Sequence, residues 1–324
     1  MSLKITGLSK KHNNSWLFRD VSFEVQKGEI VGLFGLSGSG KTALIDSVTG
    51  SAQIDAGTIE HNGTDVTGLN LNQRKFCFLK SEDHPAWKSL FNSARASSAP
   101  SGKHQITTLI EALNGSCSVL LLDNSFCDMD LHLRQSAFEQ LKQTVREKEL
   151  SVVFASHDYE EILLLCDRVA VLAGGAISQT GAPQKVYESP ETSGVAAITG
   201  RNNLFEARRL SSSKADLPEF QTIAGDHRLF AQKIERGSLG ALNQNVTLGI
   251  RPEYISISFG ASFPEDNLLK ATVTGVQFLG PTTLIRLDAN GLQLESMVLR
   301  LVGLNVGDEC MVGLPPDRIQ IFKH

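Results

Sequence analysis

The stretch Val31–Asp46, VGLFGLSGSGKTALID, constrains the fold of this chain more than any other. It holds a glycine-rich loop of the form G-x-x-x-x-G-K-[ST], preceded by the apolar run Ile30–Phe34 and followed by residues that favour helix. Glycines in such a loop let backbone N–H groups surround a polyphosphate, and the following helix presents its positive N-terminus to the same anion. The pattern therefore predicts a phosphate-binding loop between a strand and a helix.

The side chains of this loop have expected roles in binding a nucleotide. Lys41 is expected to reach the outer phosphates as a point charge, and the Thr42 hydroxyl is expected to bind Mg²⁺. The candidate nucleotide-binding residues of this stretch are Gly35, Leu36, Ser37, Gly38, Ser39, Gly40, Lys41, Thr42 and Ala43.

Length and composition place the chain among ordinary globular proteins. Its 324 residues suffice for about two domains with a sizeable core. Charged residues make up 20%, and the net charge of −4 provides no basic surface for nucleic acid. No apolar stretch reaches the roughly 20 residues of a membrane span, and the start MSLKITGLSKKH lacks the apolar core of a signal peptide. We therefore expect a cytosolic protein with no nucleic-acid partner.

The cysteines are odd in number and widely spaced. They are Cys77, Cys117, Cys127, Cys166 and Cys310. This spacing favours reduced, mostly buried thiols over disulfides or a zinc site.

Two later segments predict the rest of the nucleotide site. The run Val119–Asp123 has the pattern of a buried parallel strand that ends in a carboxylate, at the edge where open α/β sheets bind ligands. Asp123 is expected to hold Mg²⁺ there, and the alternative is a turn or helix N-cap aspartate. His157 follows a strand predicted over 151–155. It is a candidate contact for a γ-phosphate, and a structural histidine is the alternative.

Helical periodicity ends at about residue 200. Short β segments with Gly or Pro between them follow, over 247–250, 255–258, 271–278, 283–287, 294–301, 309–313 and 319–322. Strands of this length and spacing predict a small β-barrel domain. The sequence thus predicts an α/β domain over 1–200 and an all-β domain over 201–324, and spacing alone assigns no chemistry to the second.

Taken in order, these motifs resemble those of ATP-binding cassette (ABC) importer ATPases of the maltose, polyamine, sulfate and ferric-iron type. The segments that carry the resemblance are GLSGSGKT at 35–42, VLLLD at 119–123, FASHDYEE at 154–161 and DRVAVLAGGAISQTGAPQKVYESP at 167–190. Two more, LGIRPEYISI at 248–257 and VQFLGPTTLIRL at 276–287, are similar to the C-terminal TOBE domain of that subgroup. The resemblance implies an ABC-type P-loop NTPase domain followed by a small OB-like, TOBE-like barrel with a regulatory role.

Two departures from the family's pattern concern ATP hydrolysis. The family has a glutamate that polarises the attacking water, whereas here Asp123 is followed by Asn124, whose neutral amide cannot act as a general base. The family's signature segment aligns with 99–105, where Pro100 replaces a serine that acts on the facing subunit's ATP. Ser101 and Gly102 substitute for it in trans if the loop shifts by one residue. The resemblance therefore implies that the chain binds ATP and Mg²⁺ but hydrolyses ATP weakly or not at all.

Other positions complete the implied ATP site. His12 aligns with the aromatic residue that stacks on adenine, and Trp16 is a second candidate. Lys80 aligns with a glutamine that senses the γ-phosphate, and Asp130 keeps the D-loop aspartate that acts in trans. Only 21 residues separate Lys80 from Ser101, which implies a shortened helical subdomain, and in the family this subdomain helps to receive the membrane subunit.

Three functions remain open at this point. The first is the ATP-binding subunit of an ABC importer, on the inner face of the cell membrane, with permease subunits and a second ATP-binding subunit in a homo- or heterodimer. The second is a nucleotide-dependent regulatory or scaffold protein, and the third is a slow active ATPase that relies on His157. In the family other subunits choose the solute, so we expect no direct solute binding.

Overall fold

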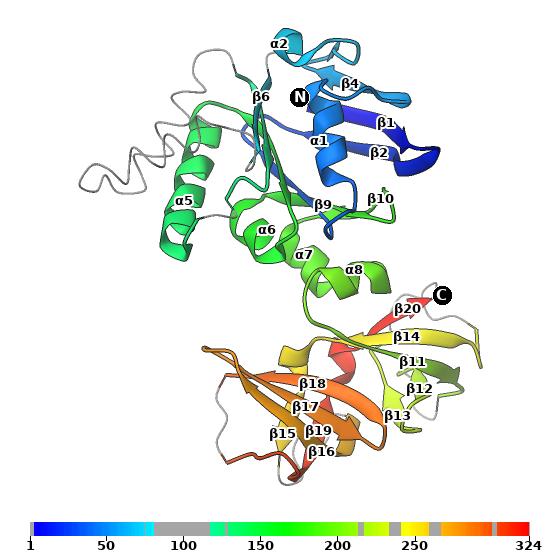
Figure 1. Ribbon diagram of the computed structural model, residues 1–324. Coiled ribbons are helices and arrows are strands. Elements are labelled where there is room, and N and C mark those ends of the chain that lie inside the picture. The colour runs from blue at the N-terminus through cyan, green and yellow to red at the C-terminus, as the bar shows by residue number, and fades with distance from the viewer. Residues whose placement is uncertain are drawn as a thin grey trace. The chain divides into compact units, whose positions relative to one another are not determined.

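Residues 1–188 form the first of two units, and residues 189–324 form the second (Figure 1). The computed structural model describes the chain over 3–74, 76–80, 117–126, 129–212, 217–232, 241–258, 267–299 and 303–323. The boundary at residue 200 stays a prediction about the functional domains.

The first unit, over its described residues, contains two sheets with helices packed against them. Its strands are β1 (Leu3–His12), β2 (Ser15–Val25), β3 (Ile30–Phe34), β4 (Ala56–His61), β5 (Thr64–Asp65), β6 (Phe76–Lys80), β7 (Val119–Asp123), β8 (Ser151–Ser156), β9 (Arg168–Ala173) and β10 (Ala176–Gly181). Its described helices are α1 (Lys41–Thr49), α2 (Leu71–Arg74), α5 (Leu131–Glu147), α6 (Tyr159–Leu165) and α7 (Pro183–Glu188). The predicted strand at 30–34 has the observed bounds.

The larger sheet places the candidate site at one of its edges. Its strand order is β10-β9-β3-β8-β7-β6, and all neighbours are parallel except β9 and β10. The smaller sheet, β2-β1-β4-β5, is antiparallel. Strands β3, β7 and β8 are buried along their whole length, as their apolar runs predict for parallel strands. Because β3, β8 and β7 are parallel neighbours, the segments that follow them meet at one sheet edge.

Alternate residues of β3 face two different layers. Val31 and Leu33 belong to a core shared with α1 and the smaller sheet. Phe34 packs edge-on against Tyr159 of α6, with 4.8 Å between ring centroids. Gly32 faces the same helix so closely that a Cβ there would come within 2.7 Å of Ile162. The larger sheet is therefore covered by α1 and the smaller sheet on one face and by α6 on the other.

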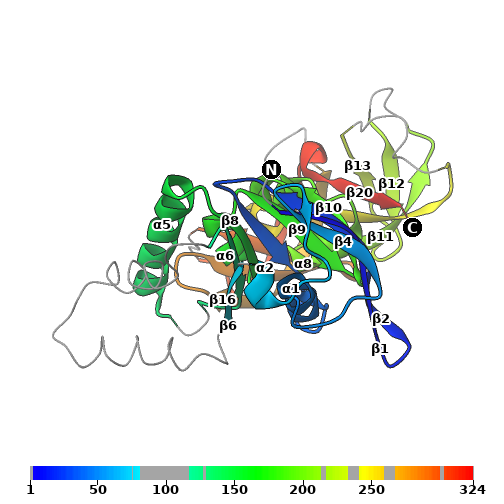
Figure 2. The same cartoon turned by 90° about the horizontal axis from the view of Figure 1, so that it is seen from above.

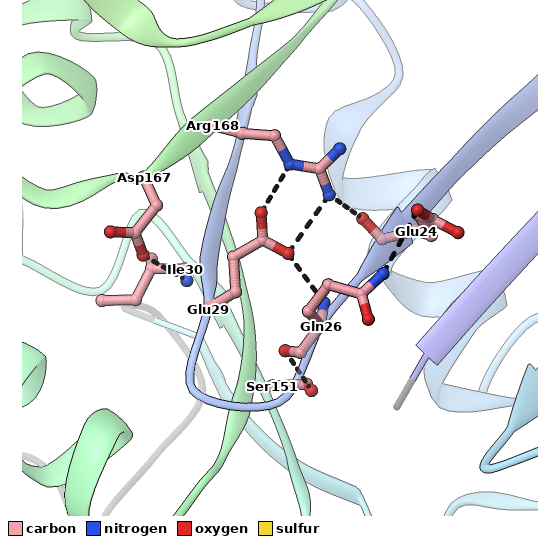
Figure 3. A network of polar contacts seen from close by, with 7 residues as sticks. All are labelled: Glu24, Gln26, Glu29, Ile30, Ser151, Asp167 and Arg168. Carbon is pink, nitrogen blue, oxygen red and sulfur yellow. Dashed lines mark hydrogen bonds and ion pairs between the residues drawn. The ribbon is translucent and has the colours of Figure 1, made fainter. Parts of the chain in front are cut away.

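Polar contacts hold the start of β3 against β9 (Figure 3). Glu29 forms an ion pair with Arg168, whose Nη2 also donates to the Glu24 carbonyl at 2.6 Å. The Asp167 carboxylate accepts from the Ile30 N–H at 2.9 Å. The hydrogen bond to the Glu29 carboxylate raises the pKa of the Arg168 guanidinium. These contacts help to set the register of β3, and thereby position the loop at its other end.

The described part of the second unit consists of one short helix followed by strands and 3-10 turns. Its elements are α8 (Ser193–Ile198), β11 (Asn203–Leu210), β12 (Glu219–Thr222), β13 (Arg228–Phe230), β14 (Asn245–Ile250), η1 (Pro252–Tyr254), β15 (Ser256–Ser258), β16 (Asn267–Phe278), β17 (Thr283–Ala289), β18 (Leu292–Val298), β19 (Glu309–Leu314), η2 (Pro316–Arg318) and β20 (Gln320–Lys323). The predicted all-β character is confirmed. The sequence reasoning missed α8 and the strands β11 to β13. α8, β12 and β13 are short, and β11 carries several charged residues.

The second unit is built from two similar halves. Asn203 and Asn267 begin matching strands, and Pro252 and Pro316 begin matching 3-10 turns, with 64 residues between the members of each pair. The two five-stranded sheets have corresponding orders, β13-β12-β11-β14-β20 and β18-β17-β16-β19-β15. The last strand of each half therefore lies in the sheet of the other half, and one core joins the two sheets.

The repeated asparagines make corresponding hydrogen bonds that join the halves. Each Nδ2 donates to a carbonyl of its own half and to a carbonyl of the other half's edge strand. The acceptors are Ile250 (3.1 Å) and Glu295 (2.9 Å) for Asn203, and Leu314 (2.8 Å) and Phe230 (2.9 Å) for Asn267. The repeat escaped the sequence reasoning because few residues are identical between the halves.

Two of the cysteines form a disulfide, which corrects the expectation of reduced thiols. Cys77 of β6 pairs with Cys117, which precedes β7. Parallel pairing of β6 with β7 brings these residues, 40 apart in sequence, to a Cα separation of 5.9 Å, within the range of disulfides. Cys166 and Cys310 are free and buried, as expected. Cys127 lies outside the described residues.

Candidate functional site

The glycine loop, residues 35–42, connects β3 to α1. Gly40 has φ +99°, in the region that favours glycine. Gly35 lies against the backbone, where a Cβ would come within 2.5 Å of the Leu172 carbonyl oxygen. Helix α1 begins at Lys41, so its first N–H groups, which have no partner within the helix, lie beside the loop. This geometry suits a polyphosphate anion.

Lys41 is the buried charge of this loop. Its side chain is only 6% exposed, and Nζ donates to the Gly35 carbonyl at 2.7 Å and the Leu36 carbonyl at 2.9 Å. Burial lowers the pKa of the ammonium, and the charge of Asp123 acts in the opposite direction. The loop therefore holds a partly desolvated positive charge, which strengthens its attraction for phosphate.

Thr42 and Asp123 meet at the edge of the sheet. The Thr42 hydroxyl donates to Asp123 Oδ2 at 2.8 Å, and Asp123 is buried at the end of β7. A hydroxyl and a carboxylate are oxygen ligands of the kind that Mg²⁺ takes, so the residues present fit that ion. The alternative interpretation of Asp123 as a helix N-cap fails, because α5 is capped by Asp130, which accepts from the Leu133 N–H at 2.9 Å.

Asn124 lies between Asp123 and His157. Its Nδ2 is 3.4 Å from Asp123 Oδ1, and its Oδ1 is 3.1 Å from His157 Nδ1. The backbone N–H of Asn124 donates to the Ala155 carbonyl of β8 at 3.0 Å. Its φ is +47°, a conformation that asparagine adopts more readily than most residues. The structure thus brings together Thr42, Asp123, Asn124 and His157.

The remaining predicted residues are less fully described. Lys80 ends β6 and pairs in register with Asp123, which places its backbone beside the site. Ser101 and Gly102 lie outside the described residues. Asp130 is exposed as the N-cap of α5, and its role in trans stays a prediction.

The two candidate adenine contacts lie on the β1–β2 hairpin, which projects at the lower right of Figure 2. Trp16 is 43% exposed, and Lys11 Nζ and the Arg19 guanidinium lie 4.5 Å and 5.4 Å from its ring centroid. His12 Nε2 is 3.2 Å from the amide of its neighbour Asn13. The backbone carbonyl oxygen of Leu17 lies 3.0 Å from the position that a Cβ atom on Gly40 would occupy. The hairpin thus packs beside the loop, and both aromatic residues remain candidates.

The sequence reasoning identified each of these residues singly but missed how they contact one another. The Asn124 contact to His157 joins residues 33 apart, and the Thr42 contact to Asp123 joins residues 81 apart. The cationic side chains beside Trp16 were also missed. Their signal in the sequence is that Lys11 and Arg19 flank a short hairpin segment that contains Trp16.

Comparison with known proteins identifies the family. Family models for the ABC transporter and the TOBE domain match residues 18–86 and 248–322. The spermidine/putrescine import ATP-binding protein PotA of Thermobifida fusca is 30% identical over 301 residues, which cover 81% of this chain and 76% of PotA. This chain belongs to the ABC importer ATP-binding proteins. Like them, it carries a C-terminal TOBE domain.

A further relative matches this ABC protein over nearly its whole length, and a solved structure matches part of it. The sulfate/thiosulfate import ATP-binding protein CysA of Bacillus cereus is 27% identical over 366 residues, covering 99% of this chain and 98% of CysA. A solved nucleotide-free ATP-binding cassette from an ABC transporter matches with a TM-score of 0.51 at 17% identity, over 62% of this chain and 99% of that one. The predicted fold class, an ABC-type α/β domain followed by an all-β TOBE domain, is confirmed.

Two expectations about this ABC protein concern membranes. The shortened helical subdomain falls between Lys80 and Cys117, outside the described residues. No helix in the described part of the chain combines the length and the apolar character that a bilayer crossing needs.

Proposed function

We propose that this ABC importer ATP-binding subunit binds Mg-ATP at its own glycine loop, hydrolyses it weakly or not at all, and pairs with another ATP-binding subunit that supplies turnover. The observation that carries the proposal is the amide of Asn124 between Asp123 and His157, at the position where the family has its general base. An amide takes no proton at ordinary pH, and general-base catalysis contributes about 10²–10⁴-fold to rate.

ATP binding is supported by the loop itself. The ammonium of Lys41 contacts the backbone of the loop, and the Thr42 hydroxyl contacts Asp123. A Mg²⁺-bound triphosphate requires such groups close together. When bound, Mg²⁺ would be held by Thr42 and Asp123 and would neutralise phosphate charge. Nucleotide then serves to hold the dimer together.

The proposed partners follow from the family. ABC importer ATP-binding subunits work as dimers with permease subunits, so we place this chain at the inner face of the cell membrane. The alignment to CysA spans 366 residues, more than the 324 of this chain, so CysA has residues that this chain lacks. This supports a shortened helical region. The relatives import solutes as different as sulfate and spermidine, so their names assign no solute here.

The decisive experiment measures ATP binding and ATP turnover by the purified full chain. We expect saturable Mg-ATP binding and a turnover about 10²-fold or more below that of the Bacillus cereus CysA protein assayed in parallel. Equal turnover by the two proteins would refute the proposal. Absence of ATP binding would refute its first half.

A second candidate is a regulatory or scaffold protein that binds nucleotide but no longer couples to a channel. The Asn124 amide favours such a regulator as much as it favours an importer subunit without ATP turnover. Affinity purification of the tagged chain from membranes distinguishes them. Stoichiometric recovery of permease subunits and a second ATP-binding subunit supports the importer, and recovery of the chain without them supports the regulator.

A third candidate is a slow active ATPase in which His157 replaces the missing carboxylate. The 3.1 Å contact of His157 with Asn124 favours it, because it holds the ring at the phosphate edge of the sheet. Under this candidate, His157→Ala abolishes a measurable basal turnover. Full retention of that turnover in His157→Ala excludes it.

A further inference from the structure

The hydrogen bonds of Asn124 have defined directions. A carboxylate only accepts hydrogen bonds, so the Asn124 group that faces Asp123 Oδ1, at 3.4 Å, must be the NH₂ group. The opposite orientation would put two oxygens against each other. The amide Oδ1 therefore faces His157 Nδ1 at 3.1 Å.

The direction of the second bond follows from the first. The amide oxygen of Asn124 can only accept, so the hydrogen must be on His157 Nδ1. A neutral imidazole carries one ring hydrogen, and Nε2 is then left with a lone pair. Thr42 donates to the other oxygen of Asp123, at 2.8 Å, so each of these three contacts pairs a donor with an acceptor.

The backbone holds the amide in this place. The Asn124 N–H donates to the Ala155 carbonyl at 3.0 Å, which ties the end of β7 to β8 two residues before His157. The φ of +47° suits asparagine and costs most other side chains about 1–2 kcal/mol. Asparagine therefore fits both the backbone and the two hydrogen bonds.

We infer that Asn124 is a positioning residue that holds neutral His157 as its Nδ1–H tautomer, so that Nε2 of His157 is the proton acceptor at this edge of the sheet. The consequence for hydrolysis rests on the proposed ATP-binding function. In the residual turnover, His157 Nε2 takes the proton of the attacking water as its oxygen bonds to the γ-phosphorus. The bond from that phosphorus to the ADP oxygen breaks, ADP leaves with the electron pair, and the imidazolium returns its proton to solvent.

The tautomer is measured on the nucleotide-free full chain, labelled with ¹⁵N in histidine, by long-range ¹H–¹⁵N correlation above the usual histidine titration range. His157→Gln assigns the signal by its loss. We expect the Nδ1–H pattern for His157 in the wild type and in Asn124→Asp, whose carboxylate also accepts. We expect the Nε2–H pattern to prevail in Asn124→Ala, and the other histidine signals report whether the variants fold.

Several results would overturn the inference. An Nε2–H pattern for wild-type His157 does so directly, as does an unchanged pattern in a folded Asn124→Ala protein. If Asn124→Ala does not fold, the wild-type and Asn124→Asp spectra decide the matter: an Nε2–H pattern for His157 in either protein overturns the inference. These spectra need no nucleotide, so a failure of ATP binding refutes the proposed function and leaves the tautomer result standing.

The kinetic consequence has its own test. With Mg-ATP, Asn124→Ala should lower the residual kcat about ten-fold with KM unchanged, and the loss should not add to that of His157→Gln, because both act through one ring. Equal kcat in Asn124→Ala overturns the role of Nε2 as base, and so does the absence of any wild-type turnover.

Discussion

The glycine loop at the end of β3 and the corner at the end of β7, Asp123 and Asn124, lie at one edge of the larger sheet with β8 between their strands. The loop combines backbone N–H groups, a helix N-terminus and the buried ammonium of Lys41. The corner keeps a carboxylate that fits Mg²⁺ but presents an amide at the base position. Binding is distributed over many groups whereas proton abstraction depends on one, so a single substitution can separate the two.

The largest expected effect concerns Mg-ATP binding by the glycine loop. Lys41→Met should weaken Mg-ATP binding roughly 1,000-fold, about 4 kcal/mol, because it removes the only charge within the loop. Isothermal titration measures this. Lys27→Met, which removes an exposed lysine paired with Glu149, is the matched control and should leave the affinity unchanged.

The same variant carries a second expectation. Burial lowers the pKa of Lys41, so its charged form is disfavoured in the fold. Its removal should therefore not lower the urea midpoint of the nucleotide-free protein. A large drop in that midpoint would mean that the lost affinity reflects unfolding, and unchanged affinity would contradict the role of the loop.

The next largest effect concerns the corner's strand, which the Cys77–Cys117 disulfide ties to β6. Closing a loop of 40 residues stabilises a fold by roughly 4 kcal/mol, chiefly by restricting the unfolded chain. Cys77→Ser should lose about this much in urea unfolding under oxidising conditions. Reduction should lower the wild-type stability to that of the variant and leave the variant unchanged.

Hydrogen exchange would show where this loss acts. We expect faster exchange in β6 and β7, and unchanged exchange in the first turn of α1. Wild-type stability that does not respond to reduction would contradict the disulfide.

A smaller effect is expected when a carboxylate, and with it a general base, is restored at position 124. Asn124→Glu should raise kcat about 10²-fold over Asn124→Gln, which has the same length but no carboxylate. Both variants should lose about 1 kcal/mol of stability, because neither side chain favours a φ of +47°. Single-turnover kinetics measures the difference. Equal rates would mean that the amide is not the sole defect and that the signature counterpart at 99–105 also limits turnover.

The smallest effect concerns His61, which contacts Ser118 Oγ at 2.9 Å just before β7. Burial lowers the pKa of His61, so the folded protein resists a proton that the unfolded chain accepts. Stability should therefore fall as pH drops through the usual histidine range toward the lowered pKa. Between pH 7.5 and 5.5, His61→Gln should lose less free energy of unfolding than the wild type, by a difference below about 1 kcal/mol. Identical pH profiles of urea unfolding would contradict this.

Much of the first unit was predictable because its signals are local. The run Ile30–Phe34 shows its strand by apolar composition, and the glycine pattern after it defines a loop through backbone freedom and one lysine. The second unit was predictable only in class. Its strands β12 and β13 are short, and their place is decided by pairing with β11. Lys80 and Ser101 could be named from alignment, but their side chains are not among the described ones.

The sequence by itself determined which residues could bind a nucleotide, and it identified Asn124 as the break in the pattern. Tertiary structure decided that Asn124 contacts His157 and that Cys77 pairs with Cys117. It also decided that the last strand of each β half lies in the sheet of the other half. The reason is physical. A turn or a helix start depends on neighbours within a few residues, whereas these contacts join residues at least 33 apart and depend on which strands pair and in which register.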